Sequence, residues 1–266
     1  AHFVPQKLSK TVLESGLFNI IEKTIDNPEE EIDSDMIFDC RGRHNRDSSN
    51  YDALINPLNS VLLAHKEGRD PNLTYTRTVA TPNGWTFIIP NVDSVSYGYL
   101  YNDTITATQV AREDFMNRFG IYQDSLPVSF ENYVAKNMFV GERTILQGNM
   151  YGFLEPMEST SINLCTHLCE QAFNEDKVSA NNIMRRIVKE LETFILWHYQ
   201  FGSKYDTPFW KYAKSLPFKP DSYFKEFIEK SKLESYFELE SKPRYDEDYY
   251  GEQWTYSSFR YWNDGV

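Results

Sequence analysis

The sequence predicts an α+β or α/β protein in which a mixed, largely antiparallel β-sheet precedes a C-terminal helical region. Two patterns indicate the sheet. Asn83-Gly84 between two β-forming runs is a strong hairpin signal. Residues 95–101 alternate at period two, which places one valine and three tyrosines on the same face of a strand. The helices are indicated by apolar side chains that recur every three or four positions over residues 183–198.

Strands and two helices are expected before residue 158. The helices cover residues 8–23 and 108–119, and Gly120 ends the second one. The strands cover residues 35–38, 77–80, 85–89, 95–101, 133–139 and 144–147.

Helices dominate from Glu158 onward. The long amphipathic helix over 183–198 is followed by shorter ones over 207–216, with Pro208 in the first turn, and over 221–233. His198 lies on the apolar stripe of the long helix, where a packing role is more common than a role as ligand or base.

Composition limits the classes of protein to be considered. In 266 residues, 41% hydrophobic and 15% aromatic content is enough for a sizeable core in one large domain or two smaller ones. A formal net charge of −12 makes nucleic acid an unexpected partner, since phosphate binding requires a basic surface. No apolar run is long enough to cross a bilayer, and residues 1–10 lack the form of a signal peptide. We therefore expect a soluble, cytoplasmic protein without a membrane partner.

The chain has only three cysteines, and so small and odd a number argues against a disulfide framework. Cys165, His167 and Cys169 collect metal-ligand types within five residues, but on a helix His167 points about 200° away from the two cysteines. We therefore expect no metal site, and buried thiols on the packed side of a helix instead. Cys40 is expected to be a core residue at a strand end.

The most informative segment covers residues 148–164. Gly148 and Gly152 allow a ligand to approach the backbone closely, and Glu158-Ser159-Thr160 would lie where a helix begins. The free N–H groups of a helix start favour an anion. An ordinary N-cap at Ser159 or Thr160, with Glu158 near the first turn, is the alternative on spacing alone.

Four segments, in the right order, resemble those of the flavin-dependent tryptophan halogenase family. Residues 148–160 are similar to its Gly-Asp-x-x-Gly-Phe-Val/Leu-Glu-Pro-Leu/Met-Glu-Ser-Thr signature. Residues 84–90 are similar to its Trp-x-Trp-x-Ile-Pro motif, and residues 35–42 to its strand ending in Asp-Cys-x-Gly. Residues 194–210 are similar to its helix ending in His-Tyr, followed by Asp-Thr-Pro-Phe-Trp.

The resemblance implies a fragment of a flavin-monooxygenase-like fold. Such a protein should begin with a Gly-x-Gly-x-x-Gly turn, and neither this turn nor a lysine in the family's catalytic context occurs here. We interpret the chain as the C-terminal portion of a longer halogenase. Residues 1–157 would be the remainder of the flavin-binding domain with a substrate-side β-sheet, and residues 158–266 a helical region with an aromatic pocket or lid.

The implied cofactor is FAD, supplied in reduced form by a separate flavin reductase, together with a halide ion. In the family, the halide is oxidised to hypohalous acid, which reaches a lysine beside an aromatic substrate. The match makes Glu158 and Ser159 the catalytic residues. Backbone groups of Thr160 and Ser161 would hold chloride or bromide. The matching cofactor-binding residues are Gly148, Asn149, Gly152, Phe153 and Leu154.

Three positions depart from the family. Ser161 replaces a glycine and narrows the halide space, while Asn149 replaces an aspartate at the flavin. Phe87 replaces the second tryptophan of the motif that separates halogenases from simple flavin monooxygenases. The residues expected on the substrate side are Trp85, Phe87, Pro90 and Trp254, the last within an aromatic-rich C-terminal segment.

The expected activity is therefore halogenation of an electron-rich aromatic compound of the indole, phenol or pyrrole type, dependent on FADH2 and O2. Two alternatives remain open at this point. One is a flavin-dependent monooxygenase, and the other is a catalytically inactive, halogenase-like binding protein. A homo-oligomer would be unsurprising.

Overall fold

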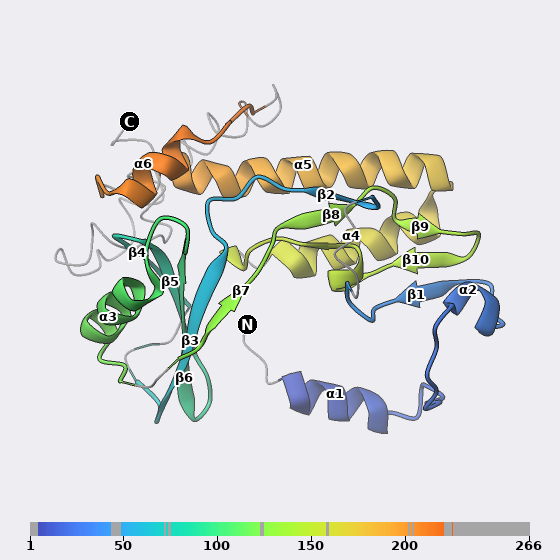
Figure 1. The fold of residues 1–266 in the computed structure, drawn as a ribbon. Coiled ribbons are helices and arrows are strands. Elements are labelled where there is room, and N and C mark those ends of the chain that lie inside the picture. Colours follow the sequence, from blue (N-terminus) through green and yellow to red (C-terminus); the bar gives the residue numbers. More distant parts are fainter. Residues whose placement is uncertain are drawn as a thin grey trace, which may run out of the picture.

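The computed structural model describes residues 5–43, 49–71, 73, 76–122, 125–157, 160–201, 203, 205–220 and 225. Its largest element is a five-stranded antiparallel sheet (Figure 1). The strands follow the order β4-β5-β6-β3-β7, and their bounds are β3 Ser60–Glu67, β4 Arg77–Thr81, β5 Gly84–Pro90, β6 Ser94–Tyr101 and β7 Pro127–Ser129.

The hairpin expected at Asn83-Gly84 is confirmed. Strands β4 and β5 pair in the register that places Thr81 opposite Gly84. Helix α3 (Thr108–Phe119) packs on β6 and ends where predicted, because Gly120 adopts a left-handed conformation with φ of 63° and donates its N–H to Met116 O. The buried Phe115 of α3 stacks on Tyr99 with ring centroids 5.4 Å apart.

Two three-stranded sheets complete the β-structure. One has the order β1-β10-β9 and the other β11-β8-β2. The pair β1–β10 is parallel and the remaining pairs are antiparallel, so the prediction of a mixed, largely antiparallel arrangement is confirmed. The bounds are β1 Ile37–Asp39, β2 Tyr51–Ala53, β8 Tyr133–Ala135, β9 Phe139–Val140, β10 Thr144–Leu146 and β11 Gly152–Phe153.

The helical region contains α4 (Thr160–Asn174), α5 (Lys177–Phe201) and α6 (Pro208–Ser215). Figure 1 shows α5 running beside α4 and the small sheets, with α6 next to the β4–β5 end of the large sheet. Thr207 caps α6 by accepting the N–H of Trp210, and Pro208 occupies the first turn as expected. The buried His198 places Nδ1 2.8 Å from Phe194 O, as expected for a packing histidine.

Two expected elements differ from the structure. The helix expected over 8–23 is shorter: α1 covers Pro5–Glu14, and the apolar side chains that follow it, including Leu17 and Ile21, are exposed and pack on no core. The strand expected over 133–139 is two strands, β8 and β9, because Met138 turns away to donate its N–H to Asn181 in α5. A short helix, α2 (Pro28–Glu31), was not anticipated. The helix expected over 221–233 lies outside the described residues.

The main core joins the sheets to α4, α5 and α6. Trp85, Tyr151, Leu164 and Trp210 are all fully or almost fully buried within it. A smaller core between α3 and the outer face of the large sheet contains Tyr99. Among the described helices, none has a stretch long and apolar enough to cross a membrane.

The expected burial of the cysteines was wrong. Cys40 is exposed because β1 ends before it, and Cys169 is exposed on the outer part of α4. Cys165 is half-buried. His167 Nδ1 lies 3.4 Å from Glu170 Oε2 on the same helix. Within the described part of the chain, no group of three His, Cys, Asp or Glu side chains has the arrangement that a metal ion requires.

Candidate functional site

The glycine loop begins directly after β10 and passes through a 3-10 turn, η1 (Gly148–Met150), into β11. Gly148 has φ of 56°, and a Cβ at this position would point into open space. A Cβ at Gly152 would meet Tyr133 O of β8 at 3.0 Å, so this glycine allows close strand packing instead. Gly148 therefore leaves room on the open side of the loop, as a ligand-binding turn requires.

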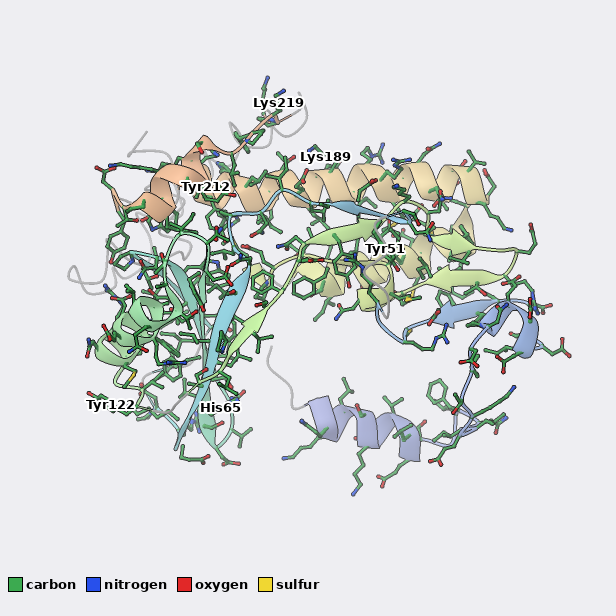
Figure 2. All side chains as sticks on the ribbon, viewed as in Figure 1. Tyr51, His65, Tyr122, Lys189, Tyr212 and Lys219 are labelled. Atoms are coloured by element: carbon green, nitrogen blue, oxygen red, sulfur yellow. The ribbon has the colours of Figure 1, made fainter. Side chains whose placement is uncertain are left out.

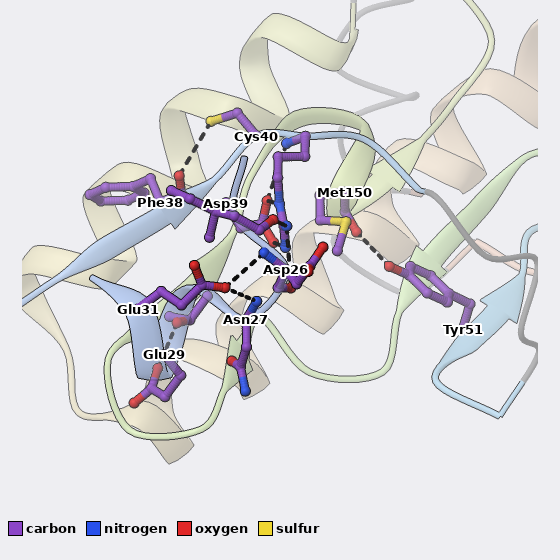
Figure 3. A network of polar contacts seen from close by, with 12 residues as sticks. Asp26, Asn27, Glu29, Glu31, Phe38, Asp39, Cys40, Tyr51 and Met150 are labelled. Atoms are coloured by element: carbon purple, nitrogen blue, oxygen red, sulfur yellow. Dashed lines mark hydrogen bonds and ion pairs between the residues drawn. The ribbon is translucent and has the colours of Figure 1, made fainter. Parts of the chain in front are cut away.

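Two tyrosines fix the carbonyl groups of this turn. Tyr133 Oη donates to Asn149 O at 2.6 Å, and Tyr51 Oη donates to Met150 O at 2.9 Å. The guanidinium of Arg43 lies 4.7 Å from the ring centroid of Tyr51 and 4.4 Å from that of Tyr133. Figure 2 labels Tyr51, and Figure 3 draws its bond to Met150. Sequence reasoning missed these residues, which lie far from the loop in the chain.

A cavity of about 1150 Å³ opens beside η1, slightly larger than the roughly 300–1,000 Å³ that is usual for small-molecule sites. Three basic side chains, Lys23, Arg41 and Lys136, contribute to its wall together with Asp26 and Met150. Each of these basic groups is paired with a carboxylate: Arg41 with Asp39 at 2.9 Å, Lys23 with Glu31 at 3.2 Å and Lys136 with Asp52 at 4.0 Å. The wall is therefore polar, with its positive charges balanced by neighbouring carboxylates. Met150 belongs to the glycine loop, so the cavity adjoins the residues expected to bind the cofactor.

The wall is ordered by the segment that resembles Asp-Cys-x-Gly. Arg41 donates to both carboxylate oxygens of Asp39 at 2.9 Å and reaches Ile25 O at 2.5 Å, which ties residues 25 and 26 to the end of β1 (Figure 3). The carboxylate of Asp39 raises the pKa of Arg41 further above its usual value. Gln147 N donates to Asp39 O at 3.0 Å, so the same corner is joined to the start of the glycine loop.

A buried polar cluster lies at the other end of the loop. Glu155 has no exposed surface, and its carboxylate accepts the Tyr199 hydroxyl at 2.7 and 2.8 Å and Asn56 Nδ2 at 2.6 Å. Trp85 Nε1 donates to Tyr199 Oη at 3.0 Å. The backbone N–H of Glu155 donates to Asn132 Oδ1 at 2.7 Å. We refer to Asn56, Trp85, Asn132, Glu155 and Tyr199 as the Glu155 cluster.

Burial raises the pKa of Glu155 to about 7, against the lowering effect of the hydrogen bonds from Tyr199, Asn56 and Trp85. Burial also raises the pKa of Tyr199 well above its ordinary value, so its hydroxyl keeps its proton and acts as a donor. An acidic residue between apolar neighbours in the sequence was the available signal for Glu155. Its partners are too far apart in the chain for spacing to reveal them.

Segments from three of the recognised motifs meet at this cluster. Trp85 comes from the segment 84–90, Glu155 from the signature loop and Tyr199 from the His-Tyr segment. The second half of residues 194–210, Asp-Thr-Pro-Phe-Trp, also contacts the cluster, since the Tyr199 ring lies 6.0 Å from that of Trp210. Trp210 Nε1 in turn donates to Thr81 O at 2.8 Å.

The substrate-side residues lie on β5. The rings of Trp85 and Phe87 are in edge contact, with centroids 6.2 Å apart on the same face of the strand. Trp85 is buried, whereas Phe87 is half-buried. Pro90 ends the strand opposite Val95 and belongs to neither the cluster nor the Trp85–Phe87 contact. Trp254 lies outside the described residues.

Glu158 and Ser159 also lie outside the described residues, and the chain on both sides of them is buried. Met157 is 1% exposed, and Thr160, the first residue of α4, is 3% exposed. The hydroxyl of Thr160 has no hydrogen-bond partner in the described structure. Ser161 is exposed, so the two residues expected to hold a halide differ in environment.

The architecture around this site is that of a known class of enzyme. A flavin-dependent halogenase from Brevundimonas sp. BAL3, BrvH, superimposes with a TM-score of 0.67 over 84% of this chain and 52% of its own, at 21% identity. A tryptophan halogenase from Shewanella frigidimarina gives a TM-score of 0.65 over 96% of this chain and 55% of its own, at 16% identity. The chain has the fold of flavin-dependent halogenases.

Sequence similarity leads to the same group. The profile of the tryptophan halogenase family matches residues 8–255, and the chain belongs to this family. Tryptophan 6-halogenase ThaL of Streptomyces albogriseolus is 26% identical over 176 residues, which cover 61% of this chain and 33% of the relative. Tryptophan 7-halogenase RebH of Lentzea aerocolonigenes is 26% identical over 206 residues, covering 69% and 39%. The chain thus spans well under half the length of these curated relatives.

Proposed function

We propose that this chain is part of an enzyme that uses reduced FAD and O2 to halogenate an electron-rich aromatic compound of the indole, phenol or pyrrole type. Family membership and the retained sequence Glu158-Ser159-Thr160 support the proposal. The observation that carries it is the burial of the chain directly before and after this sequence, at Met157 and at Thr160, the first residue of α4.

The beginning of α4 supplies what a halide needs. The free N–H groups of the first turn carry partial positive charge, and the partnerless hydroxyl of Thr160 is a further donor in a dry environment. Thr160 and Ser161 therefore remain our proposed halide residues. Ser161 is exposed, and because it replaces the family's glycine, its Cβ narrows the space beside these N–H groups.

The flavin would lie along the glycine loop. Room beside Gly148, a turn held in place by Tyr133 and Tyr51, and the adjoining cavity of about 1150 Å³ support this placement of a large cofactor. Gly152, Phe153 and Leu154 continue the same segment. Bound reduced FAD supplies, with O2, the two-electron oxidation that converts halide to hypohalous acid. A separate flavin reductase is the proposed partner that provides the reduced cofactor.

Glu158 is proposed to act on the substrate side. When hypohalous acid transfers its halogen to a ring carbon, the oxygen–halogen bond breaks, hydroxide leaves, and the new carbon–halogen bond leaves that carbon with a proton to lose. The carboxylate of Glu158 accepts this proton, and the aromatic ring is restored. A carboxylate suits the step because the positive charge that develops on the ring is stabilised by a nearby anion.

The test uses the native protein with any upstream segment, FAD, a flavin reductase, NADH and bromide. Mass spectrometry of indole, phenol and pyrrole substrates should detect brominated products that disappear when bromide is omitted. Glu158→Gln should lower product formation about 10²–10⁴-fold with unchanged FAD binding. Glu170→Gln, at an exposed position on α4, is the matched control and should remain active.

Phe87 gives one specific reason to keep flavin-dependent hydroxylation as a second candidate, because it replaces the family's second tryptophan. Hydroxylated products without brominated ones in the same assay would support that reaction and overturn halogenation. The absence of both kinds of product, with or without flavin bound, would favour a binding protein.

A further inference from the structure

We propose that Glu155 is a positioning residue, whose carboxyl group holds Trp85 of β5 in a fixed relation to the end of the signature loop through the hydroxyl of Tyr199. The catalytic part of this inference rests on the proposed function, whereas its structural part does not. Glu155 acts on Trp85 through the hydroxyl of Tyr199.

The first step is the rigidity of Glu155. Its carboxylate accepts from Asn56 and Tyr199, and its backbone N–H donates to Asn132, so both ends of the residue are bound inside a fully buried site. Buried hydrogen-bonded groups of this kind tolerate little displacement, because a partner left unpaired in a dry site has no water to replace the lost hydrogen bond. Glu155 is therefore a fixed point of the loop.

The second step is the anchoring of the chain that directly follows Glu155. Pro156 has a fixed φ, and Met157 is 1% exposed within the main core. Residues 155–157 are therefore held together at the end of the signature loop.

The third step is the connection to the strand on the substrate side. The hydroxyl of Tyr199 donates to Glu155 and accepts the indole N–H of Trp85, so a single oxygen joins the loop to β5. The Tyr199 ring is held independently by Phe209 at 6.3 Å and by Trp210 at 6.0 Å. Loss of the hydroxyl alone should therefore break the connection and leave the ring in place.

Chemistry distinguishes the variants. Glutamine at 155 has the shape of glutamate, and its oxygen can accept from Asn56 and Tyr199 while its N–H faces the Tyr199 oxygen. Glu155→Gln should thus keep the connection. Tyr199→Phe removes it with minimal change of volume, and Glu155→Leu removes it with loss of every acceptor at this position. Glu192→Gln is the control, since Glu192 is a buried carboxylate that accepts Ile55 N at 2.7 Å outside the cluster.

The structural readout is 19F NMR of protein labelled with 5-fluorotryptophan, with the Trp85 resonance assigned through Trp85→Phe. We expect Tyr199→Phe and Glu155→Leu to shift the Trp85 resonance and to speed hydrogen exchange of the amides around residues 153–157. Glu155→Gln and Glu192→Gln should leave both near the wild-type values. If Glu155→Leu does not fold, Tyr199→Phe still provides the test, because it removes only one hydroxyl group.

The catalytic readout is steady-state bromination by the native enzyme. Tyr199→Phe should lower kcat roughly tenfold to a hundredfold with little change in KM, because misplacement by about 1 Å has effects of that size. An unchanged Trp85 resonance, unchanged exchange and unchanged kcat in Tyr199→Phe would overturn the inference. A wild-type protein that brominates nothing would defeat the proposed function, while the NMR and exchange results would still decide the positioning claim.

Discussion

The ring of Phe87 lies directly over Gly98 of the neighbouring strand. The two residues are paired across β5 and β6, and a Cβ built at Gly98 would come within 2.1 Å of the ring carbon Cζ of Phe87. Gly98 is therefore glycine because the ring occupies the space of a side chain. The Phe87 ring lies against Gly98 of β6 and also makes an edge contact with the indole of Trp85. The Phe87–Gly98 contact therefore helps to hold Phe87 against Trp85.

Gly98→Ala should destabilise the protein by about 1–3 kcal/mol, as overpacking of a well-filled site does. The Phe87 ring must swing away to admit the methyl group, and its contact with Trp85 is lost. Urea unfolding followed by circular dichroism measures the effect. In a Phe87→Ala background the same substitution should have a much smaller effect, and equal losses in both backgrounds would show that the ring is not the obstacle.

Thr160→Val should leave the protein as stable as the wild type or more stable by about 1 kcal/mol. The reason is that a buried hydroxyl without a partner is unfavourable, and valine has nearly the same shape. If this hydroxyl faces a halide, bromide should raise the unfolding midpoint of the wild type more than that of the variant. Ser161→Ala, at an exposed position, is the control. A clear destabilisation by Thr160→Val without halide would reveal a partner for the hydroxyl.

Tyr133→Phe should weaken flavin binding and lower stability by about 1 kcal/mol, because the variant loses the hydrogen bond to Asn149 O and keeps the ring under Arg43. Fluorescence titration with FAD and thermal unfolding provide the two measurements. Tyr122→Phe is the control, since Tyr122 is 76% exposed and lies far from the loop (Figure 2). Equal FAD affinity in the wild type and Tyr133→Phe would show that the hydrogen bond between Tyr133 and the turn does not contribute to cofactor binding.

Stability should fall as pH rises from 4.5 toward about 7, and Glu155 is the cause. Its pKa is raised from 4.5 to about 7 in the folded state, so the folded protein binds a proton that the unfolded chain has already released in this range. The contribution is fully present below pH 4.5 and is lost as the pH increases toward about 7, by an amount on the order of 3 kcal/mol.

Glu155→Gln should remove this slope, because its amide has no proton to release. Chemical unfolding at several pH values between 4.5 and 7.5 provides the comparison, with Glu192→Gln as the control. Parallel pH profiles for the wild type and Glu155→Gln would assign the pH dependence to other groups.

Local patterns predicted the parts of the fold that depend on neighbouring residues. The Asn83-Gly84 hairpin, the end of α3 at Gly120 and the Pro208 start of α6 each follow from turn or capping chemistry within a few positions. The helix expected as far as residue 23 ended earlier, since helical periodicity without a surface to pack on is insufficient. The β8–β9 break depends on Asn181, far along the chain, and local patterns could not reveal it.

The candidate site was predictable to the same limited degree. Sequence motifs identified the glycine loop, whose residues are continuous in the chain, and the Trp85–Phe87 pair, whose rings are in contact in the structure. The Glu155 cluster requires residues 56, 85, 132 and 199 to converge, and their separations have no pattern in the chain. Cys40 was wrongly placed in the core because the end of β1 cannot be located to a single residue from sequence.

The parallel pairing of β1 with β10 has a consequence for the order of folding. Ile37 is opposite Thr144, so more than a third of the chain lies between two strands that share hydrogen bonds. Closing so long a loop is slow compared with forming the β4-β5-β6 meander or α3, whose contacts are local. During synthesis, the pairing of β1 with β10 must wait until Leu146 has left the ribosome. The corner formed by Asp39 and Arg41, and with it one wall of the cavity beside η1, is therefore assembled late.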